Sequence, residues 1–350
     1  MTLRQAAGRF AAGIVFVLGT ASGTQPAGAA DAFYGGKQMR LIVSTPPGGI
    51  YDAFARLIAE HMPKHIPGQP KIIVQNMGGA AGLTAANYMY NTAPRDGTTF
   101  AGTHQSIPTA ALLSPDGARY DPNKFGWIGS ITKDPFIVYA WHTAPVKTLE
   151  DMFTKEFIVG GAGIGASSID YAVIARDFFG LKLKIITGYS ASPAVKLAME
   201  RGEIHGTFGN GWSDLKLQQP AWVKDGTVRI LLQHGFTRHP ELPEVPLFID
   251  LAKTEVDRQA LELLLARQEF SKPYFTPPEV PAERLAILRQ AFEATVKDPA
   301  FLAVAGKAGL PVDSPMTGPE LAAMTEKLSR TPPSVVKRIE AVFESFQAGK

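Results

Sequence analysis

Residues 39–56 read MRLIVSTPPGGIYDAFAR, and this stretch predicts a buried strand, a tight glycine turn and a helix. The run Leu41-Ile42-Val43 suits a strand that is covered on both faces, as in a parallel sheet. The turn Pro47-Gly48-Gly49 ends the strand, and its glycines let backbone N–H groups approach a ligand. The following helix points its N-terminal N–H groups at the same place, an arrangement that binds small anions. The alternative is an ordinary strand-turn-helix corner.

A second turn of the same kind follows the strand expected over residues 157–162. Residues 160–168 read GGAGIGASS, and Ser167 or Ser168 can cap the next helix or donate a hydroxyl to a carboxylate. The spacing also matches a loose dinucleotide fingerprint, which requires an acidic residue after the next strand. That strand, residues 184–187, has no acidic residue, so we favour a carboxylate site over a nicotinamide site. Its candidate residues are Gly163, Gly165, Ser167 and Ser168.

Further candidates lie where other expected strands end, because ligand sites of α/β proteins form at the carboxyl ends of strands. These polar residues are His104, Ser106, Tyr189 and Asn210. Asp52 is also a candidate, although its spacing from Arg56 favours a local ion pair between residues four apart on a helix. Few charged side chains fall in this predicted site, so we expect backbone geometry, waters and loop shape to determine the specificity.

Strands and helices alternate through the first half of the chain, as in a doubly wound α/β protein. The last hundred residues are expected to be mostly helical. We expect a signal peptide over residues 1–30 and a first domain made of residues 31–132 plus 240–350. Residues 133–239 then form a second domain, and the chain crosses between the two near residues 131–136 and 233–243.

The N-terminal residues resemble a secretory signal peptide. Arg4 and Arg9 supply the positive charge, and an apolar run over residues 10–21 is shorter than the roughly 20 residues that span a bilayer. The motif Ala27-Gly28-Ala29 predicts cleavage near Ala29 or Ala30 and export to the periplasm.

The composition excludes several classes of function. The chain has no cysteine, which rules out disulfides, thiolate nucleophiles and Cys-based metal sites. Without Arg4 and Arg9 the 35 Lys and Arg fall to 33 against 32 Asp and Glu, a net charge of +1. No basic run or stripe suggests nucleic acid or a membrane surface as partner. No catalytic set, cofactor motif or metal-ligand spacing is evident, so we expect no enzyme, no cofactor and no metal.

Several segments, in this order and spacing, resemble the solute-binding proteins of tripartite tricarboxylate transporters, the Bug-type receptors. The likeness covers nearly the whole mature chain. The matching segments are Arg40-Leu41-Ile42-Val43 with Pro47-Gly48-Gly49, Asp52-x-x-Ala55-Arg56, Val74-x-Asn76-x-x-Gly79-Ala80-x-Gly82, Pro94-x-Asp96-Gly97-Thr98-Thr99, the loop from Gly161 to Ser168, Gly188-Tyr189-x-x-x-Pro193-Ala194, Pro277-Pro278-x-Val280-Pro281, and Lys297-Asp298-Pro299-Ala300-Phe301.

The resemblance implies a two-domain periplasmic binding protein, type II-like, that closes on a small organic carboxylate. In such receptors the turn after the first strand and the glycine-serine loop hold a ligand carboxylate, partly through ordered waters. Carried over, these are Pro47, Gly48, Gly49 and the candidates of the 163–168 loop. The family implies membrane permease subunits as partners, and we expect a monomer. The chain departs from the common pattern, which has a histidine after the loop serine, because Asp170 and Tyr171 stand there.

Two other functions remain open from the sequence. One is an exported enzyme that acts on a small carboxylate. The other is a sensory module whose closed form docks on a histidine kinase instead of a permease.

Overall fold

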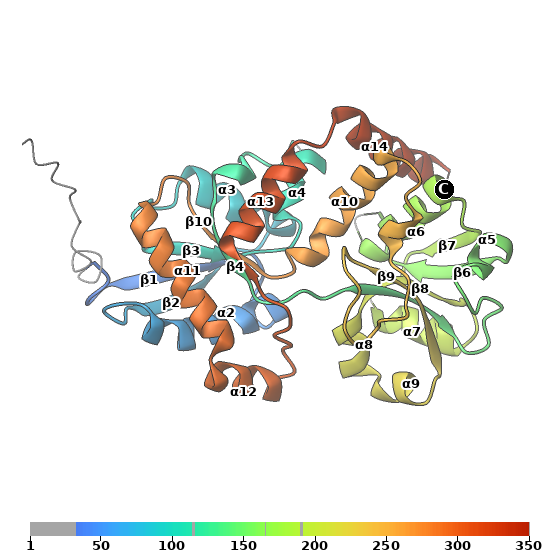
Figure 1. Cartoon of the computed structure of the whole chain (residues 1–350), viewed down its shortest axis with the longest axis horizontal. Helices are drawn as coiled ribbons and strands as arrows, with labels where there is room; N and C mark the ends of the chain where they lie inside the picture. Colours follow the sequence, from blue (N-terminus) through green and yellow to red (C-terminus); the bar gives the residue numbers. More distant parts are fainter. Residues whose placement is uncertain (1–32, 114–115, 165, 190–191, 350) are drawn as a thin grey trace, which may run out of the picture.

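We describe a computed structural model of the chain, which covers residues 33–113, 116–164, 166–189 and 192–349 (Figure 1). The expected signal peptide lies outside the described residues, and so does Gly165. The described chain folds into two α/β domains, each built around one β-sheet with helices packed on it (Figure 1). The predicted α/β class is therefore confirmed.

The first sheet has six strands in the order β11-β4-β10-β3-β1-β2. Its strands are β1 (Gln38–Val43), β2 (Lys71–Asn76), β3 (Thr99–Gly102), β4 (Gly126–Ser130), β10 (Pro273–Thr276) and β11 (Met316–Thr317). β1 pairs in parallel with both β2 and β3, as its continuous apolar run predicted. β10 runs antiparallel between β3 and β4.

The second sheet has five strands in the order β7-β6-β8-β5-β9. They are β5 (Phe136–Trp141), β6 (Phe157–Gly161), β7 (Leu183–Thr187), β8 (Gly206–Gly211) and β9 (Val228–His234). β6 is parallel to β7 and β8, whereas β5 is antiparallel to β8 and β9. The ends of β6, β7 and β8 therefore meet at one edge of the sheet.

Helices cover both sheets. The helices of the first domain are α2 (Ile50–His61), α3 (Leu83–Asn91), α4 (Ile107–Leu113), α11 (Ala282–Lys297), α12 (Pro299–Lys307) and α13 (Gly318–Ser329). Those of the second are α5 (Asp151–Thr154), α6 (Ser167–Phe179), α7 (Ser192–Glu200), α8 (Trp212–Gln218) and α9 (Pro220–Lys224). α10 (Glu255–Glu269) lies between the two sheets, and α14 (Pro333–Ala348) packs against α6 and α10 (Figure 1).

One continuous apolar core runs from the first sheet through α10 to the second. It contains Ile42 and Phe275 from the first sheet, Leu264 from α10, and Val138 and Phe208 from the second sheet. A separate core under α2 and α11 fills the other face of the first sheet. The two domains are thus joined by packing as well as by the chain.

The sheets divide the chain unevenly. The first takes its strands from residues 38–130 and 273–317, and the second from residues 136–234. The expected boundaries at 132–133 and 239–240 stay a prediction, and the contact of α14 with α6 shows that the C-terminal helix also touches the second domain.

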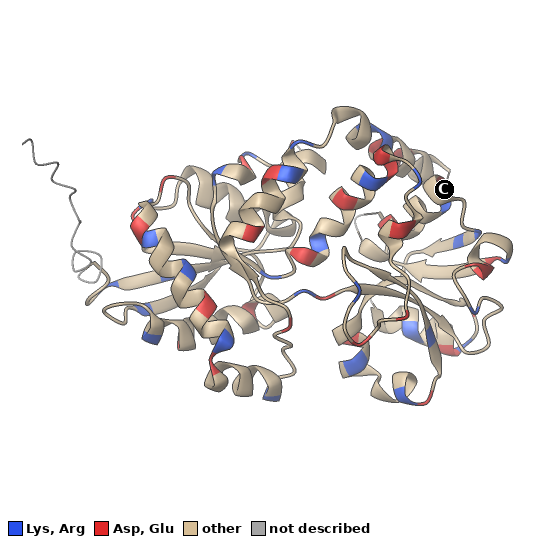
Figure 2. Cartoon of the chain, viewed as in Figure 1, with Lys and Arg blue, Asp and Glu red and all other residues tan. Residues whose placement is uncertain are grey.

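Acidic and basic residues alternate along the described chain without a block of one sign. Figure 2 shows acidic and basic residues interspersed along the helices of both domains. In the part of the chain that the structure describes, we find no helix with the length and apolar character that crossing a bilayer requires.

Candidate functional site

The turn after β1 is exposed, as an anion-binding turn must be. Pro47, Gly48 and Gly49 all lie at the surface. Gly48 has a φ of +89°, a conformation that favours glycine, whereas Gly49 has an ordinary φ of −86°. A methyl group built at Gly49 meets no atom within 4 Å, so the space above the turn is open.

Asp52 stabilises this turn through hydrogen bonds. Its carboxylate accepts hydrogen bonds from the Gly48 N–H at 2.9 Å, from Arg56 at 2.9 and 3.0 Å, and from Asn76 Nδ2 at 2.9 Å. Burial opposes ionisation of Asp52, but the bonds from Arg56, Gly48 and Asn76 outweigh it and lower its pKa to about 2. The local ion pair favoured from the sequence is therefore present, together with a bond that fixes the turn.

The loop after β3 positions His104 and Ser106. The Ser106 N–H donates to His104 Nδ1 at 3.3 Å, and the Ser106 hydroxyl lies 2.9 Å from the same nitrogen. Because a backbone N–H can only donate, Nδ1 is an acceptor, and Nε2 carries the hydrogen of the neutral ring. Burial, then the charges of Arg267 and Lys272, lower the pKa of His104 to about 4. The ring is thus a neutral donor through Nε2.

The glycine-serine loop leads into α6. Its N-cap is Ala166, which forms no side-chain cap bond, so Ser167 and Ser168 are the first two residues of the helix rather than its caps. Gly163 leaves open space around its backbone, since a methyl group built there meets no atom within 4 Å. The Ser167 side chain forms a hydrogen bond with Tyr171, so it is not a free donor.

A cavity of about 200 Å³ brings residues of both domains together. His104 and Ser106 from the first domain line it with Ser167 from α6 and Arg267 from α10. Arg267 donates to Asp170 at 3.0 Å, while its buried Nε has no hydrogen-bond partner among the described residues. Three residues predicted separately along the sequence thus share one cavity with a cation. We call this space the interdomain cavity.

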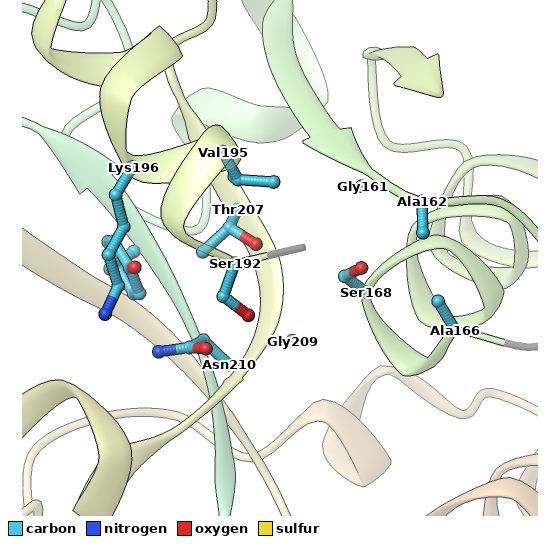
Figure 3. Close-up of a pocket in the computed structure, with 11 residues that line it drawn as sticks. Gly161, Ala162, Ala166, Ser168, Ser192, Val195, Lys196, Thr207, Gly209 and Asn210 are labelled. Carbon is cyan, nitrogen blue, oxygen red and sulfur yellow. The ribbon is translucent and has the colours of Figure 1, made fainter. Parts of the chain in front are cut away.

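A second cavity, of about 160 Å³, lies at the ends of β6 and β8 within the second domain (Figure 3). Ser168 and Asn210 line it, together with Gly161, Ser192, Lys196 and Thr207 (Figure 3). Tyr189 lines neither cavity: its N–H donates to the Gly161 carbonyl at 3.3 Å, and its ring lies against Gly160. We call this space the β6–β8 cavity.

Other candidates lie outside both cavities. Pro47, Gly48, Gly49, Asp52 and Gly163 line neither of them. The turn after β1 is nevertheless close to the interdomain cavity, because the ring of Tyr51 lies 5.4 Å from that of His104.

Three buried or half-buried cations were missed from the sequence. They are Lys196, Arg267 and Lys272, and Lys272 is 9% exposed beside the Tyr51 ring. Burial lowers the pKa of Lys272 to about 8, although Asp134 opposes this shift. Arg267 is the one charged side chain among the described residues that line the interdomain cavity, and Lys196 the one in the β6–β8 cavity, so the expectation of few charged side chains near the site stays a prediction.

The comparisons with known proteins agree with one another. The profile of the tripartite tricarboxylate transporter family receptor matches residues 54–339. The "UPF0065 protein in the TAR-I ttuE-ttuC' intergenic region" of Agrobacterium vitis is 26% identical over 324 residues, covering 91% of this chain and 86% of that protein.

Solved structures show the same fold. A TctC solute-binding protein from Polaromonas, solved without ligand, is 19% identical with a TM-score of 0.68, covering 87% of this chain and 99% of that one. MatC from Rhodopseudomonas palustris, solved with bound malate, is 20% identical with a TM-score of 0.55, covering 87% and 99%. These likenesses confirm the predicted two-domain binding-protein fold.

Proposed function

Because this chain belongs to the tripartite tricarboxylate transporter receptor family, we propose that it is a periplasmic receptor that captures a small organic carboxylate between its domains. The family is one of solute-binding proteins rather than enzymes, and a neighbour of the same fold was solved with the carboxylate malate.

The observation that carries this proposal is the interdomain cavity. Its wall includes the guanidinium of Arg267 and the imidazole of His104, and its residues come from both domains. A guanidinium is a donor group that binds carboxylates. The unpartnered Nε of Arg267 is one such donor, and it is already desolvated.

The turn after β1 and the glycine-serine loop before α6 are the other parts of the proposed ligand site. The backbone at Gly49 and Gly163 is unobstructed. Gly163 follows Ala162, which lines the β6–β8 cavity, and the ring of Tyr51, two residues after Gly49, lies 5.4 Å from that of His104. Hinge closure of two domains brings such loops onto a bound ligand. We assign the ligand carboxylate to these turns in the closed form, with Asp52 holding the first turn in shape rather than contacting the ligand.

A thermal-shift screen over mono-, di- and tricarboxylates and amino acids tests this function. A ligand present at one hundred times its Kd should stabilise the folded form by about 2.7 kcal/mol and raise its melting temperature. The absence of any shift at millimolar concentrations would contradict carboxylate capture. Consumption of a binding compound, followed by NMR, would instead indicate an enzyme.

The proposed function also includes export of the receptor to the periplasm and delivery of its ligand to a membrane permease. Uptake of the identified ligand should rise when the receptor is added to cells that make the permease, and unchanged uptake would argue for sensing instead. N-terminal sequencing of the periplasmic protein should begin near Ala30 or Asp31. Retention of the mature protein in membranes after a salt wash would contradict the signal peptide.

A further inference from the structure

Among the described residues, the wall of the interdomain cavity has one charged side chain, Arg267, and an acid is paired with it. Arg267 donates from Nη1 to Asp170 Oδ2 at 3.0 Å, and the two side chains are 14% and 2% exposed. Because both groups are largely out of water, their charges cancel at short range with little screening by salt. The buried Nε of Arg267 has no hydrogen-bond partner among the described residues. The cavity thus has a guanidinium donor without a net positive charge.

Asp170 belongs to this chain rather than to the common pattern of the Bug-type receptors. It stands, with Tyr171, where that pattern has a histidine. Its place in the first turn of α6 favours the ionised carboxylate, because the N-terminal end of a helix attracts negative charge. Asp170 therefore supplies a fixed negative charge beside Arg267.

The other polar groups around the interdomain cavity are uncharged. The ring of His104 is a neutral donor, and the remaining polar side chains that line the cavity are hydroxyls and an amide. The turns at Gly49 and Gly163, where the proposed function places the ligand carboxylate, add backbone N–H groups but no side-chain charge. The site therefore offers several donors to a carboxylate and no uncompensated cation.

Two lysines near the site do not change this balance. Lys272 lines neither cavity; its charge helps to keep His104 neutral, and the negative charge of Asp134 acts on its ammonium. Lys196 lines the β6–β8 cavity, which shares no described lining residue with the interdomain cavity. A second negative charge on a ligand in the interdomain cavity would thus be buried without a counter-ion, which is costly.

The rest of the cavity wall is apolar. It is formed by Ala81, Leu83, Ala110 and Leu113. Leu83 and Leu113 are half-buried, so a ligand that covers them removes apolar surface from water. Each CH₂ group that becomes buried against such a wall should strengthen binding about fourfold. This side of the cavity therefore suits a hydrocarbon chain or ring.

We propose that Asp170 is a specificity-determining residue: by cancelling the charge of Arg267 it restricts the interdomain cavity to ligands with one carboxylate and an apolar body. This inference rests on the proposed function, because it needs a carboxylate bound between the domains. Asp170 acts through Arg267 and does not itself line the cavity.

The first test compares ligands on the wild-type protein by calorimetric titration at pH 7. The probes are hexanoate, with one charge, adipate, which has the same chain length and two charges, and butyrate, which has two CH₂ groups fewer than hexanoate. Hexanoate should bind at least tenfold more tightly than adipate, because the second charge lacks a counter-ion. It should also bind roughly tenfold more tightly than butyrate, because it buries more of its chain.

The second test restores the charge of Arg267. Asp170→Asn removes the neutralising acid, so the ratio of adipate affinity to hexanoate affinity should rise on the order of tenfold. Asp177→Asn is the control, because it removes the same charge from a pair with Arg176 on the same helix, at 2.6 Å, and should leave the ratio unchanged.

The third test concerns the apolar wall. Leu113→Asn should weaken the binding of hexanoate at least fourfold. Leu112→Asn is the control, because it makes the same change in a half-buried leucine of α4 that lines neither cavity, and it should leave this affinity within twofold.

Several results would overturn the inference. Adipate binding as tight as hexanoate binding to the wild type would refute the restriction to one charge but leave the proposed function intact, whereas binding of no carboxylate would refute both. An unchanged affinity ratio in a folded Asp170→Asn protein, or an equal rise in Asp177→Asn, would refute the role of Asp170. If Asp170→Asn does not fold, the wild-type comparison still decides, and unchanged hexanoate affinity in folded Leu113→Asn would refute the apolar contact.

Discussion

Gly49→Val tests whether the turn after β1 holds the ligand, because this change separates folding from binding. Gly49 has φ −86° and ψ 171°, a β-region conformation that suits valine, and a Cβ there meets no atom within 4 Å. Gly49 is also the N-cap of α2, where valine is less favourable than glycine by about 1 kcal/mol. The lower entropy of the unfolded chain offsets about 0.4–1 kcal/mol of this cost. The free energy of unfolding should therefore change by no more than about 1 kcal/mol.

The effect on binding should be much larger. The valine side chain fills the open space above the turn, where the ligand carboxylate would accept a hydrogen bond from a backbone N–H. One such bond to a charged oxygen contributes about 1.5–3 kcal/mol, so its loss alone weakens binding roughly 10- to 150-fold. Steric exclusion of the ligand adds to this loss. Gly163→Val on the facing loop should act in the same way.

The assay is calorimetric titration with the ligand that raises the melting temperature most, alongside circular dichroism to confirm the fold. Gly306→Ala on α12 is the control, because its Cβ also meets open space and it lies far from both cavities in the sequence. Gly48 is unsuitable, since its φ of +89° strains any other residue. Wild-type affinity in a folded Gly49→Val protein would refute the placement of the ligand on this turn.

Three further substitutions are predicted from the hydrogen bonds of Asp52, Tyr171 and Arg267. Asp52→Asn should lower the free energy of unfolding by about 1–2 kcal/mol, because it weakens the hydrogen bond from Gly48. It should change the affinity for carboxylates with and without an amino group equally. A selective loss of affinity for amino or hydroxy acids in calorimetry would show that Asp52 contacts the ligand. The pKa of Asp52 is about 2 in the folded protein and 3.8 in the unfolded chain, so its contribution to stability is complete above pH 4 and is lost as the pH falls toward 2. Asp52→Asn should therefore reduce the fall in melting temperature between pH 4 and pH 2. An unchanged dependence of the melting temperature on pH would contradict this. Tyr171→Phe removes a hydroxyl that lies 2.9 Å from Gln268 Oε1 and should cost about 1–2 kcal/mol in denaturant unfolding, with a result below 0.3 kcal/mol counting against a structural role for that bond. Arg267→Met should weaken carboxylate binding at least tenfold and lower stability by roughly 3 kcal/mol, because it also breaks a buried ion pair; unaltered affinity would remove Arg267 from the site.

The first strand, its turn and its helix could be predicted because their signals are local. An apolar run, a Pro-Gly turn and an amphipathic helix lie within residues 39–56, and no distant residue is needed to interpret them. The same holds for the glycine-serine loop before α6. Together with the other matching segments, in their order and spacing along the chain, these local signals identified the family and the two-domain fold.

Long-range contacts explain what could not be predicted. β10 has four residues and begins with a proline, features that argue against a strand, yet it is wholly buried between β3 and β4. Arg267 meets Asp170 across 97 residues of sequence, and such a pair leaves no periodic pattern. Lys196 has the spacing of an ordinary surface lysine, and only the packing of α7 against the second sheet buries it.

The position of β10 also determines the order in which the two domains can fold as the chain becomes available from its N-terminal end. The second sheet uses residues 136–234, so all of its strands are available before β10 emerges at residue 273. The first sheet has its parallel strands early, but β4 joins them only through β10, and the sheet is completed by β11 at residues 316–317. Domains generally fold as units as their chain becomes available. The inserted second domain should therefore be finished first, while the domain that begins the chain waits, with an open sheet edge, for its C-terminal half.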